Sequence, residues 1–138
     1  MILIDSSVWI DRLRDHDTRQ TRALKSLIIA QQDIGVGDLM LIEVLQGTRD
    51  LRAYGLAKTH LAEFPHVQIS DHVIAEAAAR NFQTLRARGI TVRKTIDTLI
   101  ATRCILDDIP LLYSDRDFDP FVAHLGLRSV MDEHSGVN

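Results

Sequence analysis

Two acidic residues follow short apolar runs that predict buried β-strands. Asp5 closes the run 2–4, and Asp115 follows the run 111–113 after one intervening residue. In a parallel sheet both would project near the carboxyl ends of strands, where α/β proteins hold their sites. Each has a plainer interpretation as well, because Asp5 could cap the following helix and Asp115 could be a turn residue in Ser-Asp-Arg-Asp.

Two further carboxylates lie in segments whose pattern predicts burial. Glu43 is the only charge in the apolar run 39–45, and no basic residue stands three or four positions away. A helix that is apolar on every side is normally buried, where an unpaired carboxylate is costly. Asp97 shares a predicted helix face with the apolar residues three, four and seven positions later. A distant arginine could still neutralise Glu43, and Asp97 could simply favour the amino-terminal end of its helix.

Carboxylates that converged from these four positions would repel one another, and a divalent cation would relieve that repulsion. Ligation by oxygen alone suits Mg²⁺ or Mn²⁺. The six histidines form no HExxH motif and the single cysteine has no pair, so a zinc site is not expected. The residue types therefore predict a magnesium or manganese centre.

The elements that would position these carboxylates alternate between short apolar strands and helices. Strands are predicted at 2–4, 34–36, 67–69 and 111–113. Helices are predicted after Ser6 and Ser7, after Asp17 or Thr18, from Asp38 to about Gly47, over about 50–63, from Asp71 to near Gly89, from Thr95 onward and over about 120–125. This alternation predicts an α/β fold with a mostly parallel sheet.

Length and composition predict one globular domain over residues 1–138, with a loose tail from about Asp132. The net charge of −3 argues against binding nucleic acid by charge alone, although a bound metal would offset an acidic cluster. Cys104 cannot form an internal disulfide and is expected to fill apolar space, which fits a cytoplasmic protein. No signal peptide and no apolar stretch of membrane-spanning length is recognised.

Four segments, taken in order, resemble the motifs of the PIN-domain family. They are Met1–Ile10, Leu41–Gly47, Thr95–Ala101 and Leu111–Phe118, and their order and spacing are similar to those of the bacterial VapC toxins. No single segment is specific, but the four in order are. The resemblance covers nearly the whole chain and implies a three-layer sandwich, in which helices flank a mostly parallel central sheet.

The same resemblance implies an activity and partners. It implies an endoribonuclease toxin, dependent on Mg²⁺ or Mn²⁺, that hydrolyses RNA phosphodiester bonds, with transfer RNA and ribosomal RNA both open as targets. It also implies a homodimer and a cognate VapB-type antitoxin that inhibits the enzyme within a hetero-oligomer. No membrane partner is expected.

Carried over position by position, the resemblance assigns the catalytic and metal-binding carboxylates to Asp5, Glu43, Asp97 and Asp115. Ser7 would steady the site through its hydroxyl group, and Asp117 would be an additional acid. Many relatives have threonine two residues before the final acid; this chain has Tyr113 there, which puts a hydroxyl role at that position in doubt.

Several basic residues lie close in sequence to these acids. They are expected either to contact the RNA backbone or to serve only as surface charges. The residues are Arg12, Arg14, Arg93, Lys94 and Arg116.

Other functions compete with the nuclease hypothesis. A haloacid-dehalogenase-like phosphatase also begins with a strand ending in Asp, but it needs a second Asp where this chain has Ser7. A response-regulator receiver needs neighbouring acids that are missing. A non-catalytic PIN module that only binds a partner is the main alternative, and the presence of all four acids argues against it.

Overall fold

A parallel sheet of four short strands forms the centre of the protein, and the computed structural model describes residues 1–135. The strands are β1 (Ile2–Ile4), β2 (Ile34–Gly37), β3 (His66–Val67) and β4 (Leu111–Leu112). Their order is β3-β2-β1-β4, so β1 is an inner strand that pairs with β2 on one side and β4 on the other. Each crossover between parallel strands runs through helices, as this topology requires.

Eight α-helices and one 3₁₀ helix are present in the described residues. They are α1 (Ser6–Leu13), α2 (Arg19–Ile29), α3 (Asp38–Gln46), α4 (Leu51–Leu61), α5 (His72–Ala87), α6 (Thr95–Leu106), η1 (Arg116–Phe118), α7 (Asp119–Leu125) and α8 (Val130–Ser135). Side chains of Asp5, Thr18, Asp50 and Asp71 cap the first turns of α1, α2, α4 and α5. No helix in the described part of the chain is long and apolar enough to cross a membrane.

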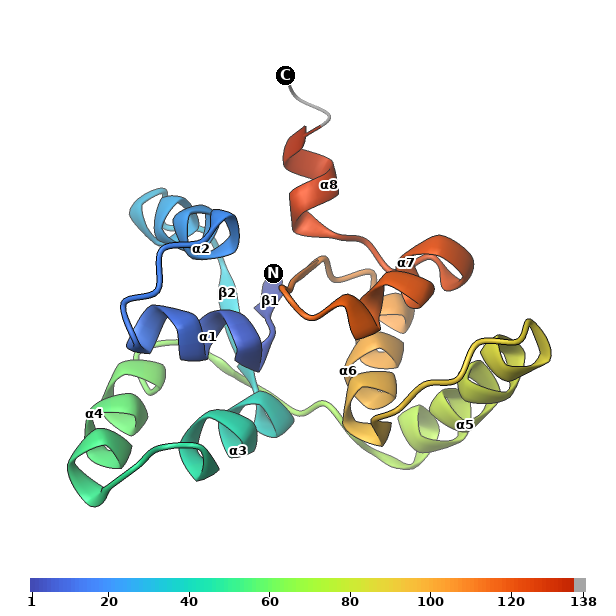
Figure 1. The fold of residues 1–138 in the computed structure, drawn as a ribbon, viewed down its shortest axis with the longest axis horizontal. Helices are drawn as coiled ribbons and strands as arrows, with labels where there is room; N and C mark the ends of the chain where they lie inside the picture. Colours follow the sequence, from blue (N-terminus) through green and yellow to red (C-terminus); the bar gives the residue numbers. More distant parts are fainter. Residues whose placement is uncertain (136–138) are drawn as a thin grey trace.

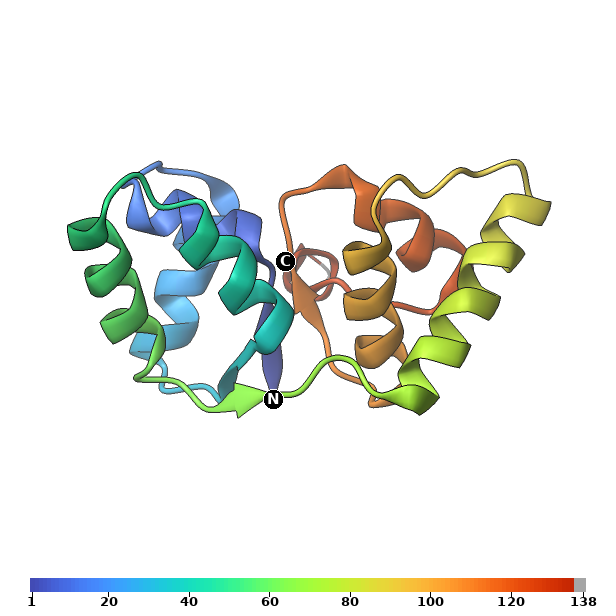
Figure 2. The same ribbon diagram turned by 90° about the horizontal axis from the view of Figure 1, so that it is seen from below.

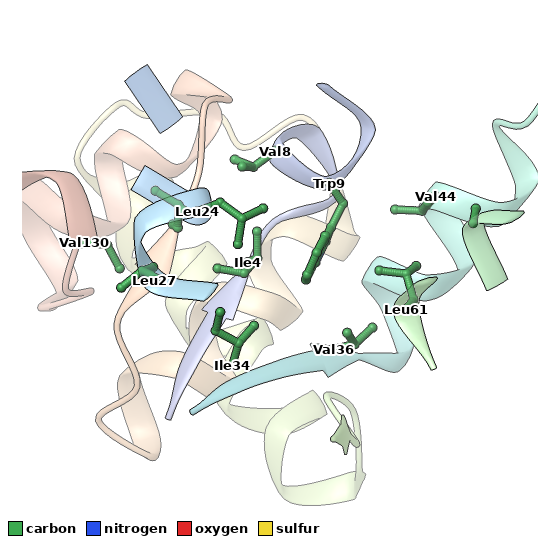
Figure 3. Close-up of a cluster of buried hydrophobic side chains, with 12 residues drawn as sticks. Ile4, Val8, Trp9, Leu24, Leu27, Ile34, Val36, Val44, Leu61 and Val130 are labelled. Carbon is green, nitrogen blue, oxygen red and sulfur yellow. The ribbon is translucent and has the colours of Figure 1, made fainter. Parts of the chain in front are cut away.

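The helices cover both faces of the sheet and produce three layers. Helices α1 to α4 lie on one side of the strands, and α5, α6 and α7 lie on the other (Figure 1, Figure 2). Successive side chains of β1 enter different cores, because neighbours on a strand point to opposite faces. Ile4 packs with Trp9 and Leu24 in one core (Figure 3), and Leu3 packs with Phe121 in the other. The predicted α/β sandwich is confirmed.

The boundaries of the short strands differ from those expected. β3 covers His66–Val67 and not 67–69: Ile69 is buried, but its N–H donates to the Asp38 carboxylate (2.9 Å) and not to a neighbouring strand. β4 stops at Leu112, so Tyr113 lies outside the ladder. The tail expected from Asp132 continues instead as α8 to Ser135, and residues 136–138 lie outside the described part.

The junction of β2 and α3 leaves no room for a side chain at Gly37. A Cβ atom built there would lie 2.5 Å from Met40 Sδ and 2.7 Å from Ile69 Cδ1. Both of these side chains are fully buried in the core between the sheet and α6. Glycine therefore allows α3 to start directly at the end of the strand, and this helix, with Glu43, packs against α1.

Candidate metal centre

Adjacent strand ends bring the first and last of the four predicted site acids to the same edge of the sheet. β1 and β4 pair with Ile4 opposite Leu112. The Asp5 N–H continues that ladder by donating to the Leu112 carbonyl (2.8 Å). Asp115 follows β4 by three residues, so the parallel pairing of the two strands carries acids that are 110 positions apart to the same edge of the sheet.

Asp5 is buried and held by the hydroxyl group predicted to steady it. Its Oδ2 accepts hydrogen bonds from the Ser7 hydroxyl (2.5 Å) and the Ser7 N–H (3.2 Å), which also caps α1. The Ser7 Oγ in turn accepts from the Ser114 N–H (3.4 Å), tying α1 to the segment after β4. Burial raises the pKa of Asp5 to about 6, and the negative charge of Glu43 adds to this increase. The hydrogen bonds from Ser7 act in the opposite direction and lower the pKa.

Glu43 is half-buried and not enclosed, and the helix that carries it differs from the prediction. α3 buries only Met40 and Val44, while Ile42 is 53% exposed, so the helix is not covered on every side. The Glu43 Oε1 accepts a hydrogen bond from the Ser6 hydroxyl (3.1 Å). Ser6 was missed in the sequence, where its only signal was a possible role as a helix cap; the partner of Glu43 is this hydroxyl on α1.

Asp97 is buried as deeply as Asp5. It is 3% exposed at the start of α6, on the face that also buries Ile100, Ala101 and Cys104, as the sequence predicts. Its Oδ2 atom is buried without any hydrogen-bond partner. Burial, followed by the charge of Asp5, raises its pKa to about 7, although the nearby ammonium group of Lys94 opposes the shift.

Asp115 and Asp117 form the outer part of the site. Asp115 caps η1, because its Oδ1 accepts from the Asp117 N–H (2.9 Å), and its Oδ2 lies 3.2 Å from Lys94 Nζ. Burial alone would raise the pKa of Asp115, but this N–H and the charges of Lys94 and Arg93 hold it below its usual value. Asp117 is paired with Arg93 (Nη2 to Oδ1, 3.0 Å).

Three of these carboxylates are close enough to share one cation. Asp97, Asp115 and Asp117 each offer an oxygen, and the three atoms lie within 4.8 Å of one another. This closest group includes Asp117, which the sequence indicated only as an additional acid. Asp5 and Glu43 border it and contribute to the field that raises the pKa of Asp97. The buried Asp97 Oδ2 has no hydrogen-bond partner, and all the neighbouring donors are carboxylate oxygens. Such a set of ligands suits a hard divalent cation.

The basic residues divide between the acidic centre and the far end of α1. Arg93 and Lys94 contact the site acids, and Arg116 is exposed on η1 between two of them. Arg12 and Arg14 lie at the carboxyl end of α1, about 10 Å along the helix axis from its capped start. The structure therefore does not bring these last two to the acids.

The contacts of Arg12 and Tyr113 show what these two side chains do instead. Arg12 Nε donates to His60 Nε2 on α4 (3.3 Å). The Tyr113 hydroxyl donates to Asp119 Oδ1 (2.8 Å), and its ring packs on Phe118. The hydroxyl groups that serve the acids are thus those of Ser6 and Ser7, and Tyr113 stabilises the start of α7.

A separate groove lies at that end of α1. It has a volume of about 540 Å³ and lies between the ends of α1 and α3 and the face of α4 that carries Ala53, Leu56 and Ala57. Its lining combines apolar side chains, among them Leu13 and Leu56, with Arg14 and Arg49. None of the site acids borders it.

Comparison with known proteins gives one consistent family. The chain matches the PIN domain over residues 2–121. It is 28% identical over 120 residues to the VapC ribonuclease Mb1587 of Mycobacterium bovis and, equally, to ribonuclease VapC11 of Mycobacterium tuberculosis, covering 86% of this chain and 90% of each relative.

Solved structures with the same fold include a toxin–antitoxin complex from Klebsiella pneumoniae, which has a TM-score of 0.68 at 19% identity, covering 94% of this chain and 97% of that one. VapBC2 from Rickettsia felis, bound to a DNA fragment from its promoter, has a TM-score of 0.74 at 16% identity, covering 94% of this chain and 97% of that one. FitAcB from Neisseria gonorrhoeae has a TM-score of 0.69 at 18% identity, covering 94% and 96%. At this identity the likeness concerns the fold.

Proposed function

This chain belongs to the PIN-domain family, and from that premise we propose that it is a metal-dependent endoribonuclease, the toxin of a toxin–antitoxin pair. The observation that carries the proposal is the group of three carboxylate oxygens within 4.8 Å, one of them on the buried residue Asp97. Lys94 and Arg93 compensate the two outer acids, but the buried Asp97 Oδ2 has no partner, and a divalent cation would supply one. The names of the relatives support ribonuclease activity and an antitoxin partner.

The residues have separate tasks in this proposal. Asp97 and Asp115, with Asp5 and Asp117 beside them, would hold Mg²⁺ or Mn²⁺. A bound ion would supply Lewis acidity and lower the pKa of a water molecule. Ser7 fixes the orientation of Asp5 through the hydrogen bonds described above.

Glu43 is suited to orient the attacking water, because Ser6 holds one of its oxygens and the side chain is only half-buried. The water oxygen attacks phosphorus, the bond from phosphorus to the 3′ oxygen breaks, and that oxygen takes a proton. The products are a 5′-phosphate and a 3′-hydroxyl group. A 2′,3′-cyclic phosphate on the cut RNA would contradict this route, because it requires the 2′-hydroxyl as nucleophile.

The groove beside α4 is suited to the antitoxin. Leu56 is 63% exposed at its edge, and Arg14 and Arg49 lie in its lining. An amphipathic antitoxin helix with apolar side chains on one face and acidic residues at its margin would complement both features. From the family resemblance we also propose that the protein forms a homodimer and acts in the cytoplasm.

The decisive test is cleavage of total RNA by the purified protein, in Mg²⁺ or Mn²⁺ and in EDTA. The wild type is compared with Asp97→Asn and with Asp33→Asn, which makes the same chemical change at an exposed position outside the centre. We expect cleavage that requires the metal and Asp97 but not Asp33. A folded wild-type protein that binds the metal and leaves every RNA intact would favour the non-catalytic module.

A further inference from the structure

The two basic residues at the start of α6 are paired with the outer acids of the centre. Lys94 Nζ lies 3.2 Å from Asp115 Oδ2, and Arg93 Nη2 lies 3.0 Å from Asp117 Oδ1. The inner acid, Asp97, has an oxygen without a hydrogen-bond partner. The protein thus neutralises the acids that solvent reaches and leaves the buried one bare.

We propose that Lys94 is a resident counter-ion of the metal centre, which a divalent ion must displace from Asp115 and which then binds an RNA phosphate. This inference rests on the proposed function, since it concerns the same site. It makes Lys94 a substrate-binding residue whose availability depends on whether the metal is bound.

The contact between Lys94 and Asp115 is of a kind that can be exchanged. The Lys94 side chain is 54% exposed, and an ammonium group on a flexible four-carbon stem can rotate away without disturbing the backbone. Residues 91–94 form neither helix nor strand, and Lys94 makes no side-chain cap to α6. Moving this side chain therefore breaks one hydrogen bond and no element of secondary structure.

A divalent ion on Asp115 would make the present position of Lys94 unfavourable. The ion and the ammonium group would compete for the same carboxylate and repel each other at short range. Besides Asp115, the acids that act on Lys94 are Asp97 and Asp117, which are the other members of the three-acid group. Once the metal neutralises these acids, an RNA phosphate is the natural anion for the released ammonium group. Metal and RNA should then favour each other's binding.

The first experiment measures the affinity of the protein for Mn²⁺ alone, by calorimetry at low ionic strength and without RNA. Lys94→Met is compared with Lys58→Met, the same change at an exposed lysine on α4. We expect Lys94→Met to bind Mn²⁺ about tenfold more tightly than the wild type, because a competing charge is removed. Lys58→Met should stay within about twofold, because its charge lies outside the centre and is screened.

The outcomes separate this inference from the proposed function. Equal Mn²⁺ affinity of wild type and Lys94→Met would overturn the displacement and leave the metal-dependent nuclease standing. A complete lack of Mn²⁺ binding by both proteins would overturn the two together. Circular dichroism of each variant checks that the fold is intact.

The second experiment tests the phosphate contact by fluorescence anisotropy of a labelled RNA oligonucleotide. Glu43→Gln serves as the background, because it should slow cleavage while the three-acid group remains. In Mn²⁺, adding Lys94→Met should weaken RNA binding about five- to tenfold and reduce the salt slope by about one phosphate contact. In EDTA the effect should be small, since Lys94 is then paired with Asp115. An equal loss under both conditions would overturn the exchange.

Discussion

Replacing Asp97 by Asn should stabilise the metal-free protein while it abolishes metal-dependent cleavage. Asp97 is buried, its Oδ2 has no hydrogen-bond partner, and its pKa is raised from 3.8 to about 7, chiefly by burial and then by the charge of Asp5. An ionised carboxylate at this position is therefore a cost of the folded state. The neutral asparagine has nearly the same shape and can donate its amide hydrogens to the surrounding carboxylates.

The magnitude follows from the difference between the folded and unfolded pKa. The shift from 3.8 to about 7 corresponds to about 4 kcal/mol at pH 8, at about 1.4 kcal/mol for each pKa unit. Part of this repulsion is shared with the other acids, so we expect Asp97→Asn to gain about 2 to 4 kcal/mol. For a chain of this length the gain corresponds to a rise in Tm of about 8 to 15 °C.

The sign of the pH dependence is fixed by the direction of the shift. Below the unfolded pKa of 3.8 the carboxyl group of Asp97 is protonated in both states and costs nothing. As pH rises from 3.8 towards the folded pKa, the carboxyl group ionises in the unfolded state before it does so in the folded state, and the free energy of unfolding of the wild type falls. The variant has no carboxyl group at this position and does not lose this stability. The advantage of Asp97→Asn should therefore shrink to about 1 kcal/mol at pH 4.5 and be complete at pH 8.

Thermal and urea unfolding in EDTA at both pH values measure this effect, with Asp33→Asn as the matched control. Mn²⁺ at one hundred times its Kd should then raise the free energy of unfolding of the wild type by about 3 kcal/mol. The increase for the variant should be much smaller. The reasoning is refuted if Asp97→Asn is less stable than the wild type in EDTA at pH 8, or if the difference between them does not depend on pH.

Three other changes have definite expected outcomes. Arg103→Met should destabilise the protein by about 1 to 2 kcal/mol in urea unfolding, because the Ile69 carbonyl loses this donor and the half-exposed carboxylates of Asp71 and Asp107 lose their shared cation. Gly37→Ala should cost about 1 to 3 kcal/mol by the same measurement, since its methyl group would meet Met40; a neutral effect would show that the junction adapts. Leu56→Asp should weaken antitoxin binding at least about tenfold in calorimetry, whereas Leu106→Asp, similarly exposed on α6, should not; equal losses would contradict the groove as the binding surface.

Local sequence patterns were enough to predict the elements and the depth of two acids. The run 2–4 followed by Asp5 specifies a strand and its end, because side chains alternate along a strand and a helix cap follows at once. The position of Asp97 on the buried face of α6 follows from the helical period, since Ile100 and Ala101 share that face. Both features depend only on neighbours within about two helical turns.

The contacts that make these acids a site depend on the tertiary structure. The order β3-β2-β1-β4 places the end of β4 beside Asp5, and the packing of α1 against α3 brings the Ser6 hydroxyl to Glu43. The inclusion of Asp117 in the closest group likewise depends on how η1 turns back towards α6. No sequence period relates residues so far apart.

The basic residues and α3 show the same division between local and long-range determinants. Proximity in sequence to Asp5 suggested that Arg12 would serve the site, but the rise of α1 carries it to His60 on α4. The apolar run around Glu43 indicated burial on all sides, whereas neighbours reach only one face of α3 and leave Ile42 exposed. The sequence by itself therefore determined which segments form strands and helices and which acids lie at their buried positions. Only the tertiary structure decided which charges meet, because the distances between them depend on strand order and helix packing and not on spacing along the chain.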